Sequence, residues 1–233
     1  MNDANTGILA LIPAFNEQAQ ISEVIHAARA FLPVLVVDDG SQDETAARSE
    51  QAGALVIRQI PNQGKGAALA AGFHYALTHG FHAVVTLDAD GQHDPQEIPH
   101  FVQAFLQRRA DLIIGRRNFE QMPWVRQLSN RLGAWAFSWA LGQPVADNQS
   151  GYRLLSAHLM ELLLNNPDQE RGFEYEVEMI VQCVLAGLRL DWVPIRTIYA
   201  GTRKSHIQPL RHLVKFLQVT LRTRRRMAAS RSK

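Results

Sequence analysis

Acidic side chains are concentrated at residues 87–94, "LDADGQHD", where the apolar run "HAVVTL" ends. Asp88 and Asp90 stand two positions apart, and Gln92 adds an amide oxygen. Carboxylates at the end of a strand can share one hard cation, and Mg²⁺ and Mn²⁺ prefer carboxylates together with substrate phosphates and water. Asp94, before Pro95, is explained as the N-cap of the next helix. We therefore predict a divalent-cation site at Asp88, Asp90 and Gln92.

Two further polar clusters have the composition of ligand-binding loops. In "VVDDGSQDET" (36–45) a carboxylate at the strand end could accept a hydrogen bond from the ring N–H of a base. Turn and cap chemistry is the alternative, but it requires only one of the two aspartates. In "NQGKG" (62–66) Lys65 begins a helix, where its charge opposes the helix dipole unless an anion lies near. This stretch lacks the glycine pattern of a dinucleotide fingerprint and the G-K-[ST] of a P-loop.

The elements that would position these clusters alternate between strand and helix. Continuous aliphatic runs predict strands at 8–13, 34–37, 54–60, 82–87 and 111–115, and amphipathic patterns predict helices at 17–32, 43–53, 64–80 and 95–109. This alternation predicts an α/β fold, a Rossmann-like, mostly parallel sheet flanked by helices. "PAFNE", "DDGS", "PNQGKG" and "DADGQHD" each follow a strand, and open α/β sheets bind ligands at that carboxyl edge. We therefore predict a nucleotide site there.

The second half of the chain is less regular. Its patterns predict helices at 123–142, 158–165, 173–188 and 209–226, a strand at 190–199 and a turn-rich stretch at 145–156. Without an internal repeat or a linker, one main domain is expected, residues 1–206, followed by a basic amphipathic helix and tail, residues 207–233.

Composition and charge narrow the cellular setting. The single cysteine, Cys183, excludes an internal disulfide and lies in an apolar stretch typical of a packed core. Neither a signal peptide nor a membrane span is apparent, so a cytoplasmic protein is expected. Residues 192–233 carry 11 Lys and Arg but neither Asp nor Glu. Such a tail favours contact with an anionic surface, membrane or nucleic acid, and the alternative is a solvated, partly disordered tail.

Taken together, the motifs carry a resemblance. "IPAFNE", "VVDDGSQDET", "NQGKGAAL", "LDADGQHDP", "IGRR" and "VADNQSGYRLL" resemble, in this order, the family 2 glycosyltransferases with the GT-A fold. The match is closest to the branch with dolichyl-phosphate mannose synthases and bacterial polyprenyl-phosphate glycosyltransferases, and it covers about residues 8 to 205. The resemblance implies transfer of a sugar, with inversion, from a GDP- or UDP-sugar to a dolichyl or undecaprenyl phosphate, aided by Mg²⁺ or Mn²⁺. It also implies a peripheral location at the inner face of an anionic membrane, with no nucleic acid as partner.

The resemblance implies roles for individual residues. The nucleoside pocket would be lined by Pro13, Phe15, Glu17, Val37 and Asp39, with Phe15 in place of the more usual tyrosine. The nucleotide would also contact Lys65, Asp88 and Ala89. Asp90, Arg117 and Arg131 would act in catalysis, the two arginines by holding the donor diphosphate or the acceptor phosphate. Arg196 and Lys204 would bind the diphosphate, although their spacing is longer than in the synthases.

Two features of the second half leave alternatives open. An acceptor phosphate needs no general base, whereas an acceptor hydroxyl would need a carboxylate, for which Asp147, Glu174 and Glu176 are candidates. The two glutamates could instead be surface carboxylates. Trp135, Phe137 and Trp139 near Arg131 could admit a lipid tail or belong to the core. The final helix carries one apolar stripe, typical of an interfacial helix or of a helix packed on the protein itself: Leu210, Leu213, Val214, Leu217 and Leu221.

Two other functions are compatible with parts of the pattern. A sugar nucleotidyltransferase also uses aspartates, a metal and a nucleotide, but it usually has a Gly- and Arg-rich loop where this chain has "PAFNE". A non-catalytic module that binds a nucleotide or another anion is the second alternative.

Overall fold

The alternation of side chains along strand β1 (Ile8–Ala14) explains why helices cover both faces of the sheet. In this computed structural model, which describes residues 7–117, 124–166, 175–196, 198 and 209–231, both faces of β1 are buried. Ile8, Ala10 and Ile12 belong to one hydrophobic cluster, whereas Leu9 and Leu11 belong to another on the opposite face. The predicted α/β architecture is therefore confirmed.

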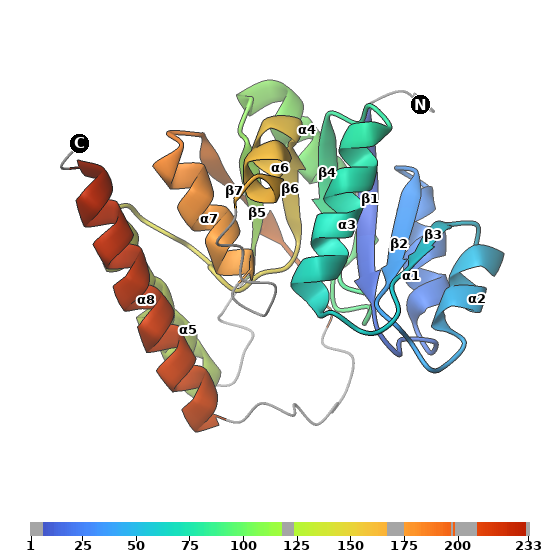
Figure 1. Ribbon diagram of the computed structural model, residues 1–233, viewed down its shortest axis with the longest axis horizontal. Coiled ribbons are helices and arrows are strands. Elements are labelled where there is room, and N and C mark those ends of the chain that lie inside the picture. Colours follow the sequence, from blue (N-terminus) through green and yellow to red (C-terminus); the bar gives the residue numbers. More distant parts are fainter. Residues whose placement is uncertain (1–6, 118–123, 167–174, 197, 199–208, 232–233) are drawn as a thin grey trace.

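Within the described ranges the sheet has seven strands in the order β3-β2-β1-β4-β6-β5-β7. Six strands share one direction: β1, β2 (Val34–Asp38), β3 (Leu55–Arg58), β4 (Ala83–Thr86), β5 (Leu112–Arg117) and β7 (Leu190–Ile195). Figure 1 shows the sheet between two layers of helices, with the carboxyl ends of these strands at the lower edge.

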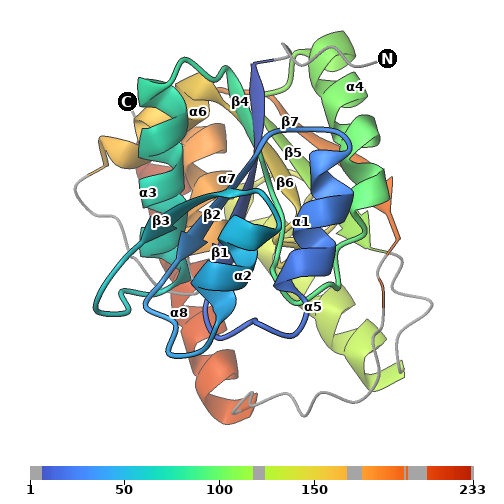
Figure 2. The same cartoon turned by 90° about the vertical axis from the view of Figure 1, so that its right-hand side faces the viewer.

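One face of the sheet is covered by α1 (Ile21–Arg29), α2 (Thr45–Gln51) and α4 (Ile98–Arg108), as Figure 2 shows. The other face is covered by α3 (Lys65–Thr78), α6 (Ala157–Leu164) and α7 (Tyr175–Leu185). Cys183 of α7 is fully buried, as its apolar surroundings in the sequence predict. A short 3₁₀ turn, Pro95–Glu97, precedes α4, and the Asp94 carboxylate caps it by accepting the backbone N–H of Gln96 at 3.0 Å.

The prediction of a turn-rich stretch over 145–156 is wrong at its end, because residues Arg153–Ser156 form strand β6. This strand lies between β4 and β5 and is antiparallel to both. It has only four residues and begins with an arginine. Its sequence therefore contains neither an apolar run nor an alternating pattern long enough to predict a strand. Because β6 is reversed, the loop before it, and not the loop after it, lies at the carboxyl edge of the other strands.

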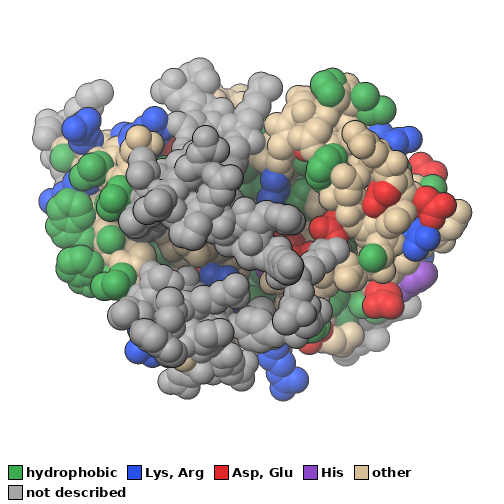
Figure 3. Space-filling view, turned by 90° about the horizontal axis from the view of Figure 1, so that it is seen from below, with side chains coloured by type: hydrophobic (Ala, Val, Ile, Leu, Met, Phe, Trp, Pro, Cys, Tyr) green, Lys and Arg blue, Asp and Glu red, His purple; other side chains and the backbone are tan. Residues whose placement is uncertain are grey.

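Helices α5 (Trp124–Leu141) and α8 (Pro209–Arg231) pack against each other at one side of the molecule (Figure 1). Phe137 and Leu141 of α5 and Met227 of α8 face the core. In Figure 3 hydrophobic and basic side chains gather at the side where these helices lie. Within the described part of the chain, none of the helices combines the length and apolarity needed to cross a membrane.

Candidate functional site

Hydrogen bonds join the loops after β1 and β2 at the carboxyl edge. The backbone N–H of Asn16 donates to the Ser41 hydroxyl at 2.9 Å, and the Asn16 side-chain oxygen accepts the N–H of Gln42 at 2.8 Å. Asn16 has a φ of 56°, which asparagine tolerates better than most residues. Sequence reasoning missed Asn16, although an asparagine between two predicted elements is a turn signal.

Asp39 links the end of β2 to the start of α3. Its two carboxylate oxygens accept the backbone N–H groups of Gln63 at 2.8 Å and of Gly64 at 2.7 Å. The Asp39 side chain is buried, so these charge-assisted bonds fix the loop that presents Lys65. Its contact with a nucleoside stays a prediction.

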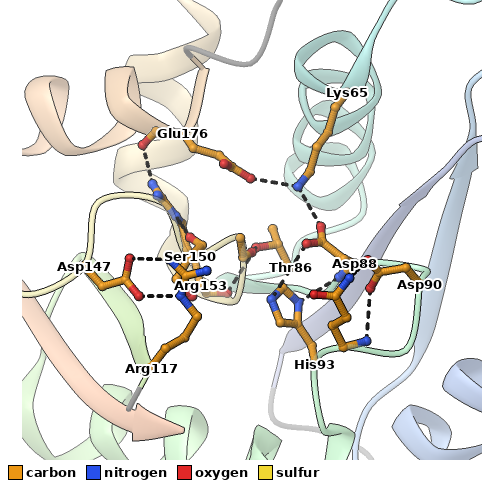
Figure 4. A network of polar contacts seen from close by, with 12 residues as sticks. Lys65, Thr86, Asp88, Asp90, His93, Arg117, Asp147, Ser150, Arg153 and Glu176 are labelled. Carbon is orange, nitrogen blue, oxygen red and sulfur yellow. Dashed lines mark hydrogen bonds and ion pairs between the residues drawn. The ribbon is translucent and has the colours of Figure 1, made fainter. Parts of the chain in front are cut away.

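Lys65 lies between two carboxylates that come from distant parts of the chain (Figure 4). Its ammonium nitrogen is 2.6 Å from Asp88 Oδ1 and 2.8 Å from Glu176 Oε1. Burial by itself would lower the pKa of Lys65, but the charges of Asp88 and Glu176 raise it. Burial would likewise raise the pKa of Asp88, but chiefly Lys65 holds it below its ordinary value. Lys65 therefore balances part of the negative charge of these two carboxylates.

Glu176 is buried in the first turn of α7, so it is not the surface helix carboxylate that we considered as an alternative. Its partner Lys65 is 111 positions away in the sequence, and no local pattern could have indicated the contact. Glu174, the other glutamate of that alternative, lies outside the described residues.

The loop after β4 arranges the other predicted metal ligands. Gly91 has a φ of 74°, and the turn lets Asp90 accept hydrogen bonds from the Gln92 backbone N–H at 3.0 Å and from its side-chain amide at 2.6 Å. His93 is buried and accepts the Asp88 N–H through Nδ1 at 3.0 Å. Burial lowers the pKa of His93, so the ring is neutral near pH 7.

A second ion pair lies beside the first. Arg117 Nε is 2.6 Å from Asp147 Oδ2, and its Nη2 is 2.9 Å from Oδ1. Asp147 is fully buried. Next to it the buried guanidinium of Arg153 donates to the backbone carbonyls of Ser150 at 2.8 Å, of Asn148 at 3.3 Å and of Glu176. Arg153 was missed because an arginine beside a turn looks exposed in the sequence.

The remaining predicted residues are less closely gathered. Pro13 and Ala14 end β1, and Val37 and Ala89 are buried near the same edge. The exposed residues among them are Phe15, Arg131 on α5 and Arg196 just after β7. Glu17 donates its backbone N–H to the Thr45 hydroxyl at 2.8 Å. The Ile198 N–H donates to the Gln92 carbonyl at 3.0 Å, which brings the segment after β7 to the loop after β4. Lys204 lies outside the described residues.

These residues fit a divalent cation that is held jointly with a nucleotide. Within the described ranges, three or more His, Cys, Asp or Glu side chains do not come together as a metal cluster. Mg²⁺ is typically bound by one or two carboxylates plus substrate phosphates, and the Asp88 and Asp90 pair is such a donor set. The role of Gln92 as a ligand stays a prediction, since its amide nitrogen faces Asp90.

Comparisons with known proteins identify the family of this chain. The family model "Glycosyl transferase family 2" matches residues 10–159. An undecaprenyl-phosphate mannosyltransferase from Micrococcus luteus is 30% identical over 203 residues, which cover 81% of this chain and 82% of that protein. A UDP-N-acetylglucosamine–dolichyl-phosphate N-acetylglucosaminyltransferase from Methanococcus voltae is 30% identical over 219 residues, covering 82% of this chain and 86% of that protein.

Among solved structures, glucosyl-3-phosphoglycerate synthase from Mycobacterium tuberculosis is similar in fold. Its complex with Mn²⁺, UDP and phosphoglyceric acid has a TM-score of 0.67 at 27% identity and covers 93% of this chain and 78% of that one. A complex of the same enzyme contains Mg²⁺ and UDP, so the predicted use of Mg²⁺ or Mn²⁺ is consistent with these structures. This chain belongs to glycosyl transferase family 2 and is a glycosyltransferase with the GT-A fold, as its sequence predicts.

Proposed function

We propose that this glycosyltransferase moves a sugar, with inversion, from a nucleotide diphosphate-sugar to a polyprenyl phosphate. The undecaprenyl-phosphate and dolichyl-phosphate acceptors of the two relatives, as their names give them, support such an acceptor. The observation that carries the proposal is that both described candidates for a general base are already paired with cations: Asp147 with Arg117 and Glu176 with Lys65. An acceptor phosphate is anionic near pH 7 and needs no such base.

The residues at the edge then have distinct tasks. Asp39 fixes the loop before α3, and Lys65 presents its positive charge beside Asp88. A divalent cation, Mg²⁺ or Mn²⁺, would be held by Asp88 and Asp90 and would supply positive charge opposite the leaving diphosphate. Arg196, which lies beyond the end of β7, would add to that charge, and Arg131 on α5 would hold the acceptor phosphate.

An exposed apolar surface supports a lipid acceptor. Trp135 and Trp139 of α5 are 71% and 51% exposed, and Leu217 and Leu221 of α8 are 50% and 54% exposed. The guanidinium of Arg224 stacks over the Trp139 ring at 5.1 Å. Tryptophan with arginine is typical of helices that lie in the headgroup region of a bilayer. We propose that α5 and α8 hold the enzyme peripherally on an anionic membrane, at its cytoplasmic face.

Two faces of α8 lie in different environments. Thr220, Thr223 and Met227 are buried, whereas Leu217 and Leu221 are exposed, so packing on the protein itself does not account for these two leucines. Leu210, Leu213 and Val214 are not among the described side chains. Arg226 pairs with Glu178 of α7 at 2.8 Å, which fixes the helix to the domain.

A thermal-shift panel of UDP-, GDP- and other nucleotide sugars with Mn²⁺ tests the donor. At least one donor should raise the melting temperature, and Asp90→Ala should abolish that shift. Transfer from that donor should then occur to polyprenyl phosphate and not to the unphosphorylated polyprenol. Phosphoglyceric acid is the control for a water-soluble acceptor. If none of the donors raises the melting temperature, the proposal is refuted. If sugar is transferred to phosphoglycerate and not to polyprenyl phosphate, the lipid acceptor is refuted.

A further inference from the structure

Lys65, Asp88 and Glu176 form a closely packed group from three separate elements. Lys65 begins α3, Asp88 follows β4 and Glu176 lies in the first turn of α7. Gly151, in the loop before β6, packs against all three. A Cβ atom at Gly151 would lie 3.0 Å from Asp88 Oδ2 and Glu176 Oε1, and 3.1 Å from Lys65 Nζ. Gly151 therefore closes one side of the group, whereas Lys65 and Asp88 remain partly exposed to solvent at 41% and 31%.

The position of the lysine conflicts with a divalent cation at the same carboxylate. Lys65 Nζ is already 2.6 Å from Asp88 Oδ1. Two cations repel strongly at such distances in a partly buried site. Glu176 offers the lysine a second anionic partner at 2.8 Å, and its side chain is only 11% exposed. The ammonium can therefore leave Asp88 without losing all of its compensating charge.

We propose that Lys65 is a built-in counterion with two positions: it neutralises Asp88 when the site is empty, and it stays on Glu176 alone when a divalent cation binds Asp88. The proposal rests on the proposed function. On Glu176 alone, the ammonium has N–H donors left for the diphosphate of the donor, because a lysine carries three of them. Glu176 is then a positioning residue that acts through Lys65, and it is not a general base.

The first position is tested by titrating the protein with Mn²⁺ alone. The electron paramagnetic resonance signal of the free ion measures how much Mn²⁺ remains unbound. Lys65→Met removes the competing ammonium, and we expect Mn²⁺ to bind at least tenfold more tightly than to the wild type. Asp88→Asn in the Lys65→Met background should reverse this gain. Arg58→Met is the matched control, since Arg58 pairs with Asp38 at 3.3 Å at the same edge and does not touch Asp88. Equal Mn²⁺ affinity of Lys65→Met and Arg58→Met would overturn the proposal.

Steady-state kinetics test the second position. Glu176→Gln should raise the KM for the donor about tenfold with little change in kcat and an unchanged pH profile, and Glu176→Asp should restore part of the loss. In the Lys65→Met background, Glu176→Gln should change the donor KM less than twofold, because its effect is transmitted by the lysine. A kcat reduced more than a hundredfold, with loss of the acidic limb of the pH profile, would identify a general base and overturn the proposal.

The two experiments separate this inference from the proposed function. Mn²⁺ binding requires neither a sugar donor nor an acceptor, so its outcome stands even when the acceptor is wrong. If the wild type transfers no sugar to any acceptor, the proposed function is refuted. If Lys65→Met nevertheless binds Mn²⁺ more tightly than the wild type, the counterion role of Lys65 remains in place.

Discussion

Arg117 and Asp147 form a two-point ion pair, with Nε 2.6 Å from Oδ2 and Nη2 2.9 Å from Oδ1. Arg117 is the last residue of β5, and Asp147 lies in the loop that leads into β6. The pair therefore holds the loop of a reversed strand against the end of its neighbour. Asp147 is buried, so the ion pair with Arg117 offsets the cost of removing its carboxylate from water.

Arg117→Ala should destabilise the protein by about 3–5 kcal/mol, since it leaves a buried carboxylate without its cation. Arg117→Lys keeps the charge but loses the two-point geometry, and we expect a smaller loss. Urea unfolding measures both. Arg116→Ala, at the exposed neighbouring position, should stay within about 0.5 kcal/mol of the wild type. The prediction fails when Arg117→Ala is no less stable than Arg116→Ala.

Gly151→Ala should impair the site more than the fold. The added methyl group would press on Asp88, Glu176 and Lys65, while the backbone of Gly151 requires no left-handed conformation. We expect the kcat/KM for the donor to fall at least tenfold, with a small change in melting temperature. Gly187→Ala is the opposite control, because Gly187 has a φ of 69° and open space around it. That variant should lose stability and keep its activity per folded molecule.

The α5–α8 surface should bind anionic vesicles. Replacing Trp135 and Trp139 by serine should weaken binding to phosphatidylglycerol vesicles at least tenfold, because both side chains are more than half exposed and would leave the headgroup region. Leu106→Ser is the matched control, since Leu106 is 63% exposed on α4. Deletion of residues 207–233 should weaken binding further and reduce its salt dependence. Equal binding of all three variants and the wild type would contradict the membrane role.

Cys183 should be unreactive in the native protein. Burial, with a smaller contribution from Asp111, raises the pKa of its thiol to about 12. The stabilising contribution of this raised pKa is fully present below the ordinary value of 9.0 and is lost as the pH rises towards 12. At pH 8 a thiol reagent should therefore label Cys183 only in the fraction of molecules that urea has unfolded. Rapid labelling without urea would show that the residue is accessible.

The sequence was sufficient for the parts of the fold that repeat a local pattern. The strands β1 to β5 are aliphatic runs, and the loops after β1 to β4 contain turn and cap residues, so their common edge followed from the direction of the strands. The position of Asp39, Asp88 and Asp90 at this edge was predicted in this way. Their individual roles were inferred from the family resemblance and from the chemistry of carboxylates.

The contacts that the sequence could not indicate are long-range ones. Glu176 contacts Lys65 across 111 positions, and Asp147 contacts Arg117 across 30. Arg153 is buried because three backbone carbonyls surround its guanidinium, which is a property of the folded loop and not of any local pattern. Strand β6 was missed for a related reason, since its two neighbours in the sheet define it more than its own four residues do.

The late position of β6 in the chain has a consequence for synthesis on the ribosome. Among the strands that the structure describes, β4 pairs with β1 and β6, and β5 pairs with β6 and β7. Until residues Arg153–Ser156 have emerged, a nascent chain carries an open edge on β4 and an unpaired β5, and such edges are templates for aggregation. The four residues of β6 therefore join two incomplete parts of the sheet in one step. A fragment that ends at β5 should be insoluble, even though it contains the whole loop from Asp88 to Asp94.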